Sequence, residues 1–184
     1  MKTVDYVVSG YIFKEDKVLL VYHKKLKKWL PPGGHIKKNE NPIEALVREV
    51  YEETNFQISV CHNFCSFKKG DVLILPSPHH IQWEKIDKEH FHVDLVYLCQ
   101  IEKEGSLKKG VKFINLNDLK NKKDIPKDVI YFAHYFYKIH LNKTGINDIK
   151  LPIMSYLVEK EKSSYFSSIK LFVIQHIKKN TIKF

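Results

Sequence analysis

The chain has 184 residues, of which 43% are hydrophobic and 12% aromatic, and its formal net charge is +10. This length predicts one domain with an appendage, and the apolar content excludes global disorder. The apolar runs fall short of the roughly 20 residues that span a bilayer, and no signal-peptide pattern is seen. Because the three cysteines show no disulfide pattern, we expect a cytoplasmic protein. Because the apolar runs are short, we expect no membrane partner.

The positive charge comes almost entirely from lysine, since Arg48 is the single arginine. Such a field steers polyanionic molecules, including RNA and phosphorylated substrates, towards the protein. The basic residues form no arginine-rich or aromatic-interleaved stretch, which is the pattern of a nucleic-acid groove. Nucleic acid is therefore a disfavoured partner, although composition leaves it open.

The first part of the chain alternates strand patterns with turn signals. Strands are predicted over Thr3–Lys14 and Lys17–Lys25, and the continuous apolar run over 18–21 indicates a strand covered on both faces. A basic connection is expected over Leu26–Leu30. The prolines and glycines of 31–34 are then expected to break regular structure.

The clearest local signal predicts a helix over Pro42–Thr54. Asn41 suits the N-cap position, Glu44 lies three residues later as in a capping box, and proline occupies the first helical position. Asn55 is expected to end the helix in the left-handed conformation that asparagine tolerates. Apolar residues at helical spacing predict the buried face: Ile43, Leu46, Val47, Val50 and Thr54.

The second part of the chain is predicted to add strands and a further helix. The strand segments are Gln57–Phe67, Val72–Leu75, Ile81–Ile86, Phe91–Ile101 and Val111–Leu116. A helix is predicted from Pro126 to about Leu141. This mixture predicts an α/β layered domain over residues 1–142. Residues 143–184 are expected to form a C-terminal extension, helical from Ile153, that packs on the domain or forms a homodimer.

The predicted helix carries three carboxylates, Glu49, Glu52 and Glu53, on a stripe rotated well away from its apolar face. Like charges three and four residues apart weaken a helix by roughly 0.2–0.5 kcal/mol per pair. A divalent cation explains the arrangement, because Mg²⁺ and Mn²⁺ take carboxylate, water and phosphate oxygens as ligands. A solvated acidic face is the alternative that the helix alone leaves open.

The spacing around these carboxylates resembles the signature of the Nudix hydrolase family, G-x5-E-x7-R-E-U-x-E-E-x-G-U, in which U is apolar. The departure is Asn55 in place of glycine, and asparagine is the mildest replacement where a positive φ is needed. The segments 29–34 and 113–119 are also similar to the family, which extends the resemblance to about residue 140. The signature positions are Gly34, Glu40, Arg48, Glu49, Val50, Glu52, Glu53, Asn55 and Phe56.

The resemblance implies a fold, a reaction and a cofactor. The fold is α/β, a Nudix-type α/β/α sandwich with a mixed β-sheet. The reaction is metal-dependent hydrolysis of the diphosphate linkage of a nucleoside diphosphate derivative, such as a nucleoside triphosphate or a nucleotide sugar. Water attacks at phosphorus, and Mg²⁺ or Mn²⁺ is the expected cofactor. The expected partner is a small nucleotide.

The resemblance also implies metal-binding roles for four residues of the signature. Glu52 and Glu53 are expected to be the main metal ligands. Glu49 is expected to be a further ligand or the base that takes a proton from water. The Gly34 carbonyl is a plausible added ligand, since glycine allows close approach of the backbone.

The other signature residues are expected to act through these ligands. Arg48 is expected to orient the glutamates, because its guanidinium is a fixed fork of donors and Glu44 and Glu52 lie four residues away on either side. Glu40 and Asn55 are expected to stabilise the loop and the helix end. A base from outside the signature stays an alternative, with three candidates: Glu84, Glu89 and His90.

Residues that bind the rest of the substrate are weakly specified. Trp29, Tyr6 and Trp83 are candidates for stacking on a base, although aromatic residues in strands are more often core residues. His90 is a candidate for contact with phosphate. It shares one strand face with His92, so a hydrogen-bonded scaffold is the alternative.

Two other functions stay open. A non-catalytic Nudix-fold domain acts as a nucleotide sensor, although intact glutamates at 49, 52 and 53 argue against it. An RNA-decapping Nudix enzyme exploits positive charge, although the chain lacks an arginine-rich basic stretch. The physiological substrate and the phosphorus attacked do not follow from the residues.

Overall fold

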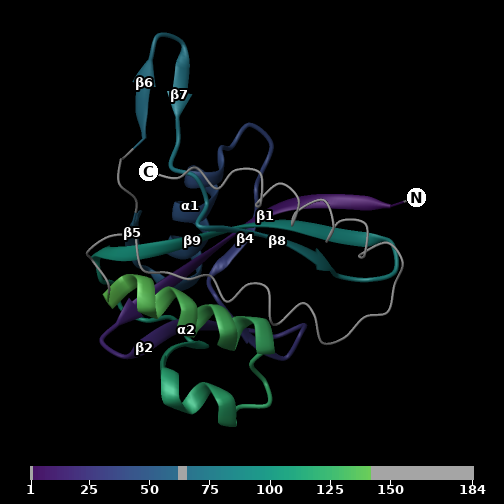
Figure 1. Ribbon diagram of the computed structural model, residues 1–184, viewed down its shortest axis with the longest axis vertical. Helices are drawn as coiled ribbons and strands as arrows, with labels where there is room; N and C mark the ends of the chain where they lie inside the picture. Colours follow the sequence, from purple (N-terminus) through teal and green to yellow (C-terminus); the bar gives the residue numbers. More distant parts are fainter. Residues whose placement is uncertain (1, 62–65, 142–184) are drawn as a thin grey trace, which may run out of the picture. The chain divides into compact units, whose positions relative to one another are not determined.

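The structure, a computed structural model, describes residues 2–61 and 66–141 (Figure 1). The first part of the chain forms β1 (Thr3–Lys14), β2 (Lys17–His23), β3 (Lys28–Leu30), β4 (Gly33–His35) and α1 (Pro42–Thr54). The later part forms β5 (Gln57–Val60), β6 (Phe67–Lys69), β7 (Val72–Ile74), β8 (His80–Lys85), β9 (His90–Lys103), β10 (Val111–Asn115), the 3-10 helix η1 (Leu116–Asn121) and α2 (Lys127–Leu141).

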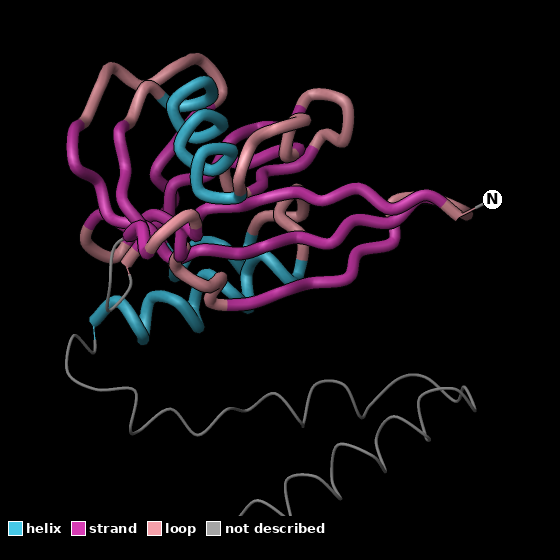
Figure 2. Tube along the Cα trace, turned by 90° about the horizontal axis from the view of Figure 1, so that it is seen from above, coloured by secondary structure: helices cyan, strands magenta, loops and turns pink. Residues whose placement is uncertain are grey.

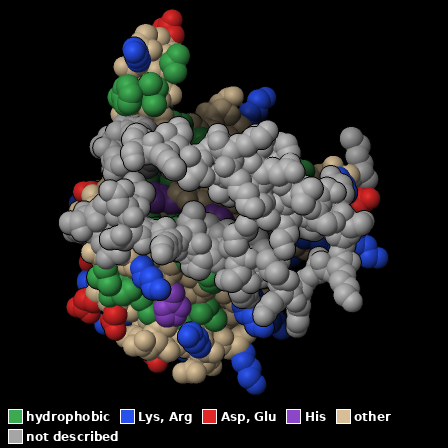
Figure 3. Space-filling view, in the orientation of Figure 1, with side chains coloured by type: hydrophobic (Ala, Val, Ile, Leu, Met, Phe, Trp, Pro, Cys, Tyr) green, Lys and Arg blue, Asp and Glu red, His purple; other side chains and the backbone are tan. Residues whose placement is uncertain are grey.

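Most strands build one mixed sheet in the order β10-β2-β1-β9-β5, with β3 beside β2, β4 beside β1 and β8 beside β9. β1 and β9 run parallel, from Thr3 opposite His90 to Ile12 opposite Cys99. The other described pairings are antiparallel. β6 and β7 form a separate hairpin that projects from the sheet (Figure 1). Apolar side chains are visible along this hairpin in Figure 3.

Helices α1 and α2 cover opposite faces of the sheet (Figure 2). Successive strand residues point to opposite faces, so adjacent residues enter different cores. Leu19 packs in the core under α1 with Leu46, whereas Leu20 packs in the core under α2 with Phe136. Both leucines are fully buried, which confirms that this strand is covered on both faces. The α/β/α sandwich with a mixed sheet is confirmed.

The observed strands differ from the predicted ones by more than two residues in three places. The predicted connection before the prolines contains β3, which pairs with β2. The glycine pair, expected to be irregular, forms β4 against Val7–Ser9 of β1. β5 ends at Val60, and Phe67, the expected end of the same strand, opens β6. β5 cannot continue along β9 because β8 pairs with the next stretch of that strand, His80 opposite Val96.

The predicted extension, residues 143–184, and its boundary at 142 lie outside the described residues. Within 2–61 and 66–141, no helix combines the length and apolarity that crossing a membrane requires.

Candidate active site

The first turn of α1 is held by reciprocal hydrogen bonds. The Asn41 side chain accepts from the backbone N–H groups of Ile43 and Glu44, and the Glu44 carboxylate accepts from the backbone N–H of Asn41. This is the predicted capping box, which satisfies N–H groups that have no partner within the helix. The buried face of α1 consists of Ala45, Leu46, Val50 and Thr54. Val47 was expected on that face but is 38% exposed, since it lies at its margin.

The last turn of α1 ends at Asn55 in the predicted left-handed conformation, with φ 65° and ψ 14°. Its backbone N–H donates to Tyr51 O, and its side-chain Nδ2 donates to Ser106 O at 2.9 Å. Gly105 allows this close approach, because a Cβ there would lie 2.4 Å from the Asn55 carbonyl oxygen. Asn55 therefore ends the helix and also holds the loop that follows β9.

The single arginine links the loop before α1 to carboxylates on the helix. Arg48 donates from Nε and Nη2 to the two carboxylate oxygens of Glu40, at 2.6 and 2.8 Å. Its Nη1 lies 2.5 Å from Glu49 Oε1 and 3.5 Å from Glu52 Oε2. The hydrogen bonds from Arg48 lower the pKa of Glu40 to about 2. Glu44, the other expected neighbour of Arg48, instead closes the capping box.

Glu53 and Glu49 face the glycine pair of β4. Glu53 Oε2 accepts a hydrogen bond from the Gly33 N–H at 3.0 Å. Burial, with the negative charges of Glu49 and Glu52, raises the pKa of Glu53 to about 7. The Glu49 carboxylate lies so close to Gly34 that a Cβ there would be 2.6 Å from Glu49 Cδ. β4 and α1 thus bring two carboxylates against the backbone of the glycine pair, and Glu52 lies on the same helix.

This glutamate cluster, Glu49, Glu52 and Glu53, fits a divalent cation. Burial first, and the charges of Glu49 and Glu52 in addition, raise the pKa of Glu53, and a bound cation would favour its ionised form against both effects. A Cβ at Gly34 would collide with the Glu49 carboxylate, so glycine at this position lets the backbone and an oxygen donor lie close together. Glu52 is half-exposed, so the cluster is open to solvent on that side.

Two of the predicted stacking residues lie together, on the face of the sheet that carries α1. Tyr6 and Trp83 both pair with Val93, from β1 and β8, so the three side chains share a face. Val8, two residues after Tyr6, belongs to the core under α1. Tyr6 is 59% exposed and Trp83 61% exposed, and Trp83 stacks on Phe91 at 5.0 Å between ring centroids.

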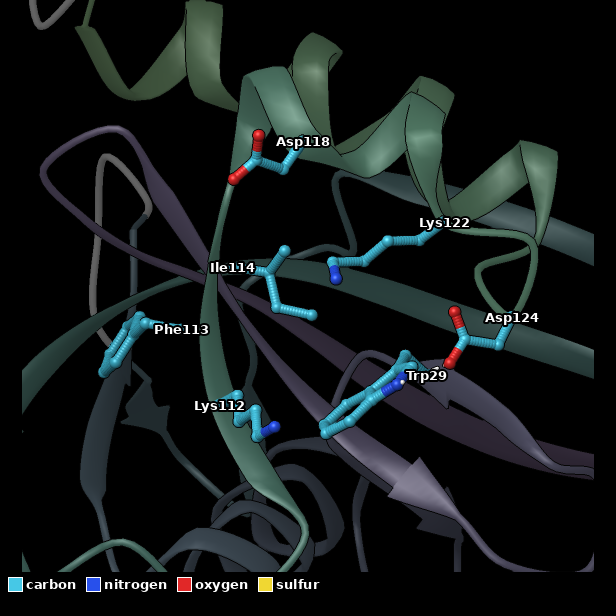
Figure 4. A pocket seen from close by; sticks show the side chains of 7 residues that line it. All are labelled: Trp29, Lys112, Phe113, Ile114, Asp118, Lys122 and Asp124. Atoms are coloured by element: carbon cyan, nitrogen blue, oxygen red, sulfur yellow. Dashed lines mark hydrogen bonds between the residues drawn. The ribbon is translucent and has the colours of Figure 1, made fainter.

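Trp29, the third stacking candidate, lies in a different place. Its Nε1 donates to Asp124 Oδ2 at 2.9 Å, and Lys112 Nζ lies 5.5 Å from its ring centroid. These contacts fix the indole at a cavity of about 450 Å³ beside β10 and η1 (Figure 4). The residues that line this cavity are Trp29, Lys112, Phe113, Ile114, Asp118, Lys122 and Asp124.

The alternative bases lie away from α1. His90 and Glu84 are on the face of the sheet opposite α1, where Glu84 pairs with His92 across β8 and β9. Burial, with the charges of Asp94 and Asp128, raises the pKa of Glu84 to about 7. Glu89 is exposed just before β9. The structure therefore places none of the three with the glutamate cluster on α1.

A buried polar group that the sequence analysis missed lies on this opposite face. Asp94 is 7% exposed, and its Oδ2 accepts a hydrogen bond from Ser9 Oγ at 2.8 Å. Among the described residues, Asp94 Oδ1 and Gln82 Oε1 are buried without a hydrogen-bond partner. Burial raises the pKa of Asp94 to about 6. The available signal was a carboxylate inside the otherwise apolar run of β9.

A family model described as the NUDIX domain matches residues 4–135. The chain therefore belongs to the Nudix family. A solved structure described as a hydrolase of the NUDIX family from Clostridium perfringens is similar to it, with 30% identity and a TM-score of 0.60. That alignment covers 74% of this chain and 97% of the other.

Two curated relatives are similar over shorter stretches. A "Probable DHNTP pyrophosphohydrolase" from Lactococcus lactis subsp. cremoris is 33% identical over 96 residues, 52% of this chain and 54% of the relative. A "Putative ADP-ribose pyrophosphatase" from Bacillus subtilis is 37% identical over 49 residues, 27% of this chain and 24% of the relative. The alignments therefore span about half the length of the first relative and a quarter of the second.

Proposed function

We propose that this protein is a metal-dependent Nudix pyrophosphohydrolase that cleaves the diphosphate linkage of a nucleoside diphosphate derivative by attack of water at phosphorus. The observation that carries the proposal is the contact of Glu53 with Gly33 and of Glu49 with Gly34, with Arg48 bound to Glu49 and Glu40. Membership of the Nudix family supports the same reaction.

Three carboxylates and one backbone carbonyl would hold the cation. Glu52 and Glu53 would be the main ligands, and the Gly34 carbonyl would add a further oxygen. Mg²⁺ or Mn²⁺ bound there supplies charge that offsets the phosphates and lowers the pKa of a coordinated water. The Gly33 N–H donates a hydrogen bond to Glu53 Oε2, which holds the Glu53 side chain in place.

Arg48 and Glu49 would divide the remaining work. Arg48 binds Glu49 through Oε1, so we assign contact with the cation or with the water proton to Oε2. The two hydrogen bonds from Arg48 to Glu40 fix the guanidinium on its other side. Glu40 also accepts from the Lys37 N–H at 3.0 Å. Arg48 is therefore proposed as a positioning residue rather than one that contacts the reacting phosphorus.

We further propose that a nitrogen heterocycle of the substrate binds near Asp94. Ser9 of β1 donates to Asp94 of β9 and is also the strand partner of Gly33 in β4. β1 therefore lies between the strand that carries Asp94 and the glycine pair. The unpartnered Asp94 Oδ1 and Gln82 Oε1 are acceptors for N–H groups of a ring. The partial match to a relative named for DHNTP makes triphosphates the first substrates to test.

A substrate panel tests the proposal. The full chain is incubated with nucleoside triphosphates, DHNTP, ADP-ribose and nucleotide sugars, in Mg²⁺ or Mn²⁺ and in excess chelator. We expect release of pyrophosphate or of a mononucleotide from at least one compound, with the activity lost in chelator. Hydrolysis in ¹⁸O-water then identifies the phosphorus attacked. Tight nucleotide binding without cleavage in either metal would contradict the proposal and support a nucleotide sensor.

A further inference from the structure

A second group of potential metal ligands lies on the sheet face opposite α1. Asp5 comes from β1, His35 from β4, and His90 and His92 from β9. Asp5 pairs with His92, and His35 pairs with Val7, two residues after Asp5, so these side chains share one face. His90 joins them because it lies two residues before His92. Three strands therefore assemble this Asp–His cluster.

The donor atoms of Asp5, His90 and His92 lie at ligand-to-ligand distances, and His35 lies at such a distance from Asp5. Asp5 Oδ2 is 3.5 Å from His90 Nε2 and 3.4 Å from His35 Nε2. His90 Nε2 is 3.0 Å from His92 Nε2. A tetrahedral zinc ion with bonds of about 2.0–2.1 Å keeps its ligand atoms about 3.3 Å apart. The observed separations scatter around that value, and donor atoms of Asp5, His90 and His92 all lie within 4.8 Å of one another.

A neighbouring hydroxyl group orients one of the imidazoles. Thr3 Oγ1 lies 2.9 Å from His90 Nδ1, on the side of the ring away from the cluster. A proton on Nδ1 that is donated to this hydroxyl leaves the lone pair on Nε2, as metal-binding histidines require. Thr3 is fixed in turn, because its backbone N–H donates to Glu89 O at 2.8 Å.

We propose that Asp5, His90 and His92 bind a zinc-class transition-metal ion, with His35 as the fourth ligand, at a site separate from the glutamate cluster. Imidazole nitrogens favour Zn²⁺, Co²⁺ and Ni²⁺, whereas an all-carboxylate site favours Mg²⁺ and Mn²⁺. The ion would tie β1, β4 and β9 together on the other face of the sheet from the glutamate cluster, and His35 directly follows the glycine that contacts Glu49. This inference is independent of the proposed reaction.

Titration of ZnCl₂ into the chelator-treated full chain, with excess Mg²⁺ present to occupy the glutamate cluster, tests the site. We expect one zinc ion to bind per chain, and His90→Ala and His92→Ala each to weaken that affinity by roughly 10-fold or more. His23→Ala removes a histidine at the end of β2, outside the cluster, and serves as the matched control. Glu53→Gln is a second control, because it removes a proposed ligand of the glutamate cluster and leaves the Asp–His cluster intact. Both of these variants should bind zinc like the parent.

Three further measurements keep the test valid if an alanine variant unfolds. Zinc should raise the melting temperature of the parent, and Thr3→Val, which keeps all four ligands, should weaken zinc binding several-fold. X-ray absorption of the zinc-loaded parent should show imidazole scattering. Equal zinc affinity in the parent and in folded His90→Ala or His92→Ala would overturn the proposal. A zinc spectrum without imidazole would also overturn it.

Discussion

One carboxyl group on each face of the sheet, Glu40 on the α1 side and Asp94 on the opposite side, is stabilised in a contrasting way. On the α1 side, an arginine binds the carboxylate of Glu40 directly and lowers its pKa to about 2. On the opposite face, Asp94 is buried beside a serine hydroxyl, and burial raises its pKa to about 6. The first arrangement keeps the Glu40 carboxylate charged and fixes the guanidinium that also binds Glu49. The second favours a neutral carboxyl group that can donate or accept a hydrogen bond.

Removing one charge from the glutamate cluster should give the largest effect. Glu53→Gln keeps the size of the side chain and an oxygen for the Gly33 N–H, but it removes a proposed ligand. We expect turnover to fall by roughly 10²-fold or more. The melting temperature without metal should stay the same or rise, because a repulsive carboxylate is lost.

Glu44→Gln is the matched control for this prediction, since it makes the same change on the same helix within the capping box. It should leave turnover near that of the parent. If Glu53→Gln hydrolyses the best substrate as fast as Glu44→Gln does, Glu53 is not a catalytic ligand.

The raised pKa of the buried Asp94 carboxyl group should make the free energy of unfolding depend on pH. The pKa of Asp94 is raised on folding to about 6, so the folded state binds the proton more tightly than the unfolded state. Stability is therefore lost as pH rises from about 4 through 6, and it stays lost above that range. We expect Asp94→Asn to remove about 1.4 kcal/mol of the loss between pH 5 and pH 8.

Urea unfolding at pH 5 and pH 8 measures this difference. Asp87→Asn is the control, because Asp87 is exposed and hydrogen bonds to backbone N–H groups lower its pKa. That carboxylate is ionised throughout the range, so its replacement should leave the slope unchanged. A slope that Asp94→Asn does not flatten would show that burial of Asp94 has no effect on its ionisation.

The close contact between β4 and α1 predicts an intermediate effect. Gly34→Ala would place a Cβ 2.6 Å from Glu49 Cδ, and the carboxylate at the end of a flexible side chain would have to move. We expect about a 10-fold loss of turnover, the scale of about 1.4 kcal/mol, with little change in melting temperature. Gly10→Ala provides the control, because the atoms nearest to a Cβ at Gly10 are side-chain atoms at 3.3–3.5 Å. Parent-like turnover in Gly34→Ala would show that the position of Glu49 does not matter.

The helix end should give the smallest effect. Asn55 has φ 65°, which a β-branched residue resists, so Asn55→Val should cost of order 1 kcal/mol or more of unfolding free energy. Asn55→Gly tolerates the conformation but loses the hydrogen bond to Ser106 O, and we expect a smaller cost. Equal unfolding free energies for the two variants would contradict this interpretation.

Local signals explain which parts of the molecule were predictable. The caps and bounds of α1 follow from neighbouring residues, and the observed Pro42–Thr54 agrees with the predicted helix from Pro42 to about Thr54. β3 and β4 are short, and their pairing with distant strands leaves no periodic pattern. The Arg48–Glu40 clamp was missed because it spans a loop, whereas helical spacing pointed to Glu44. The Asp–His cluster depends on the parallel pairing of β1 with β9, which local residues do not encode.

Binding of Mn²⁺, followed by electron paramagnetic resonance, tests the central claim most directly because it requires no knowledge of the substrate. The glutamate cluster should bind Mn²⁺ in the parent and in Glu44→Gln, and Glu53→Gln should weaken that binding by roughly 10-fold or more. Zinc-site variants such as His92→Ala should bind Mn²⁺ like the parent. Equal Mn²⁺ affinity in the parent and in Glu53→Gln would contradict the assignment of the glutamate cluster as the metal centre.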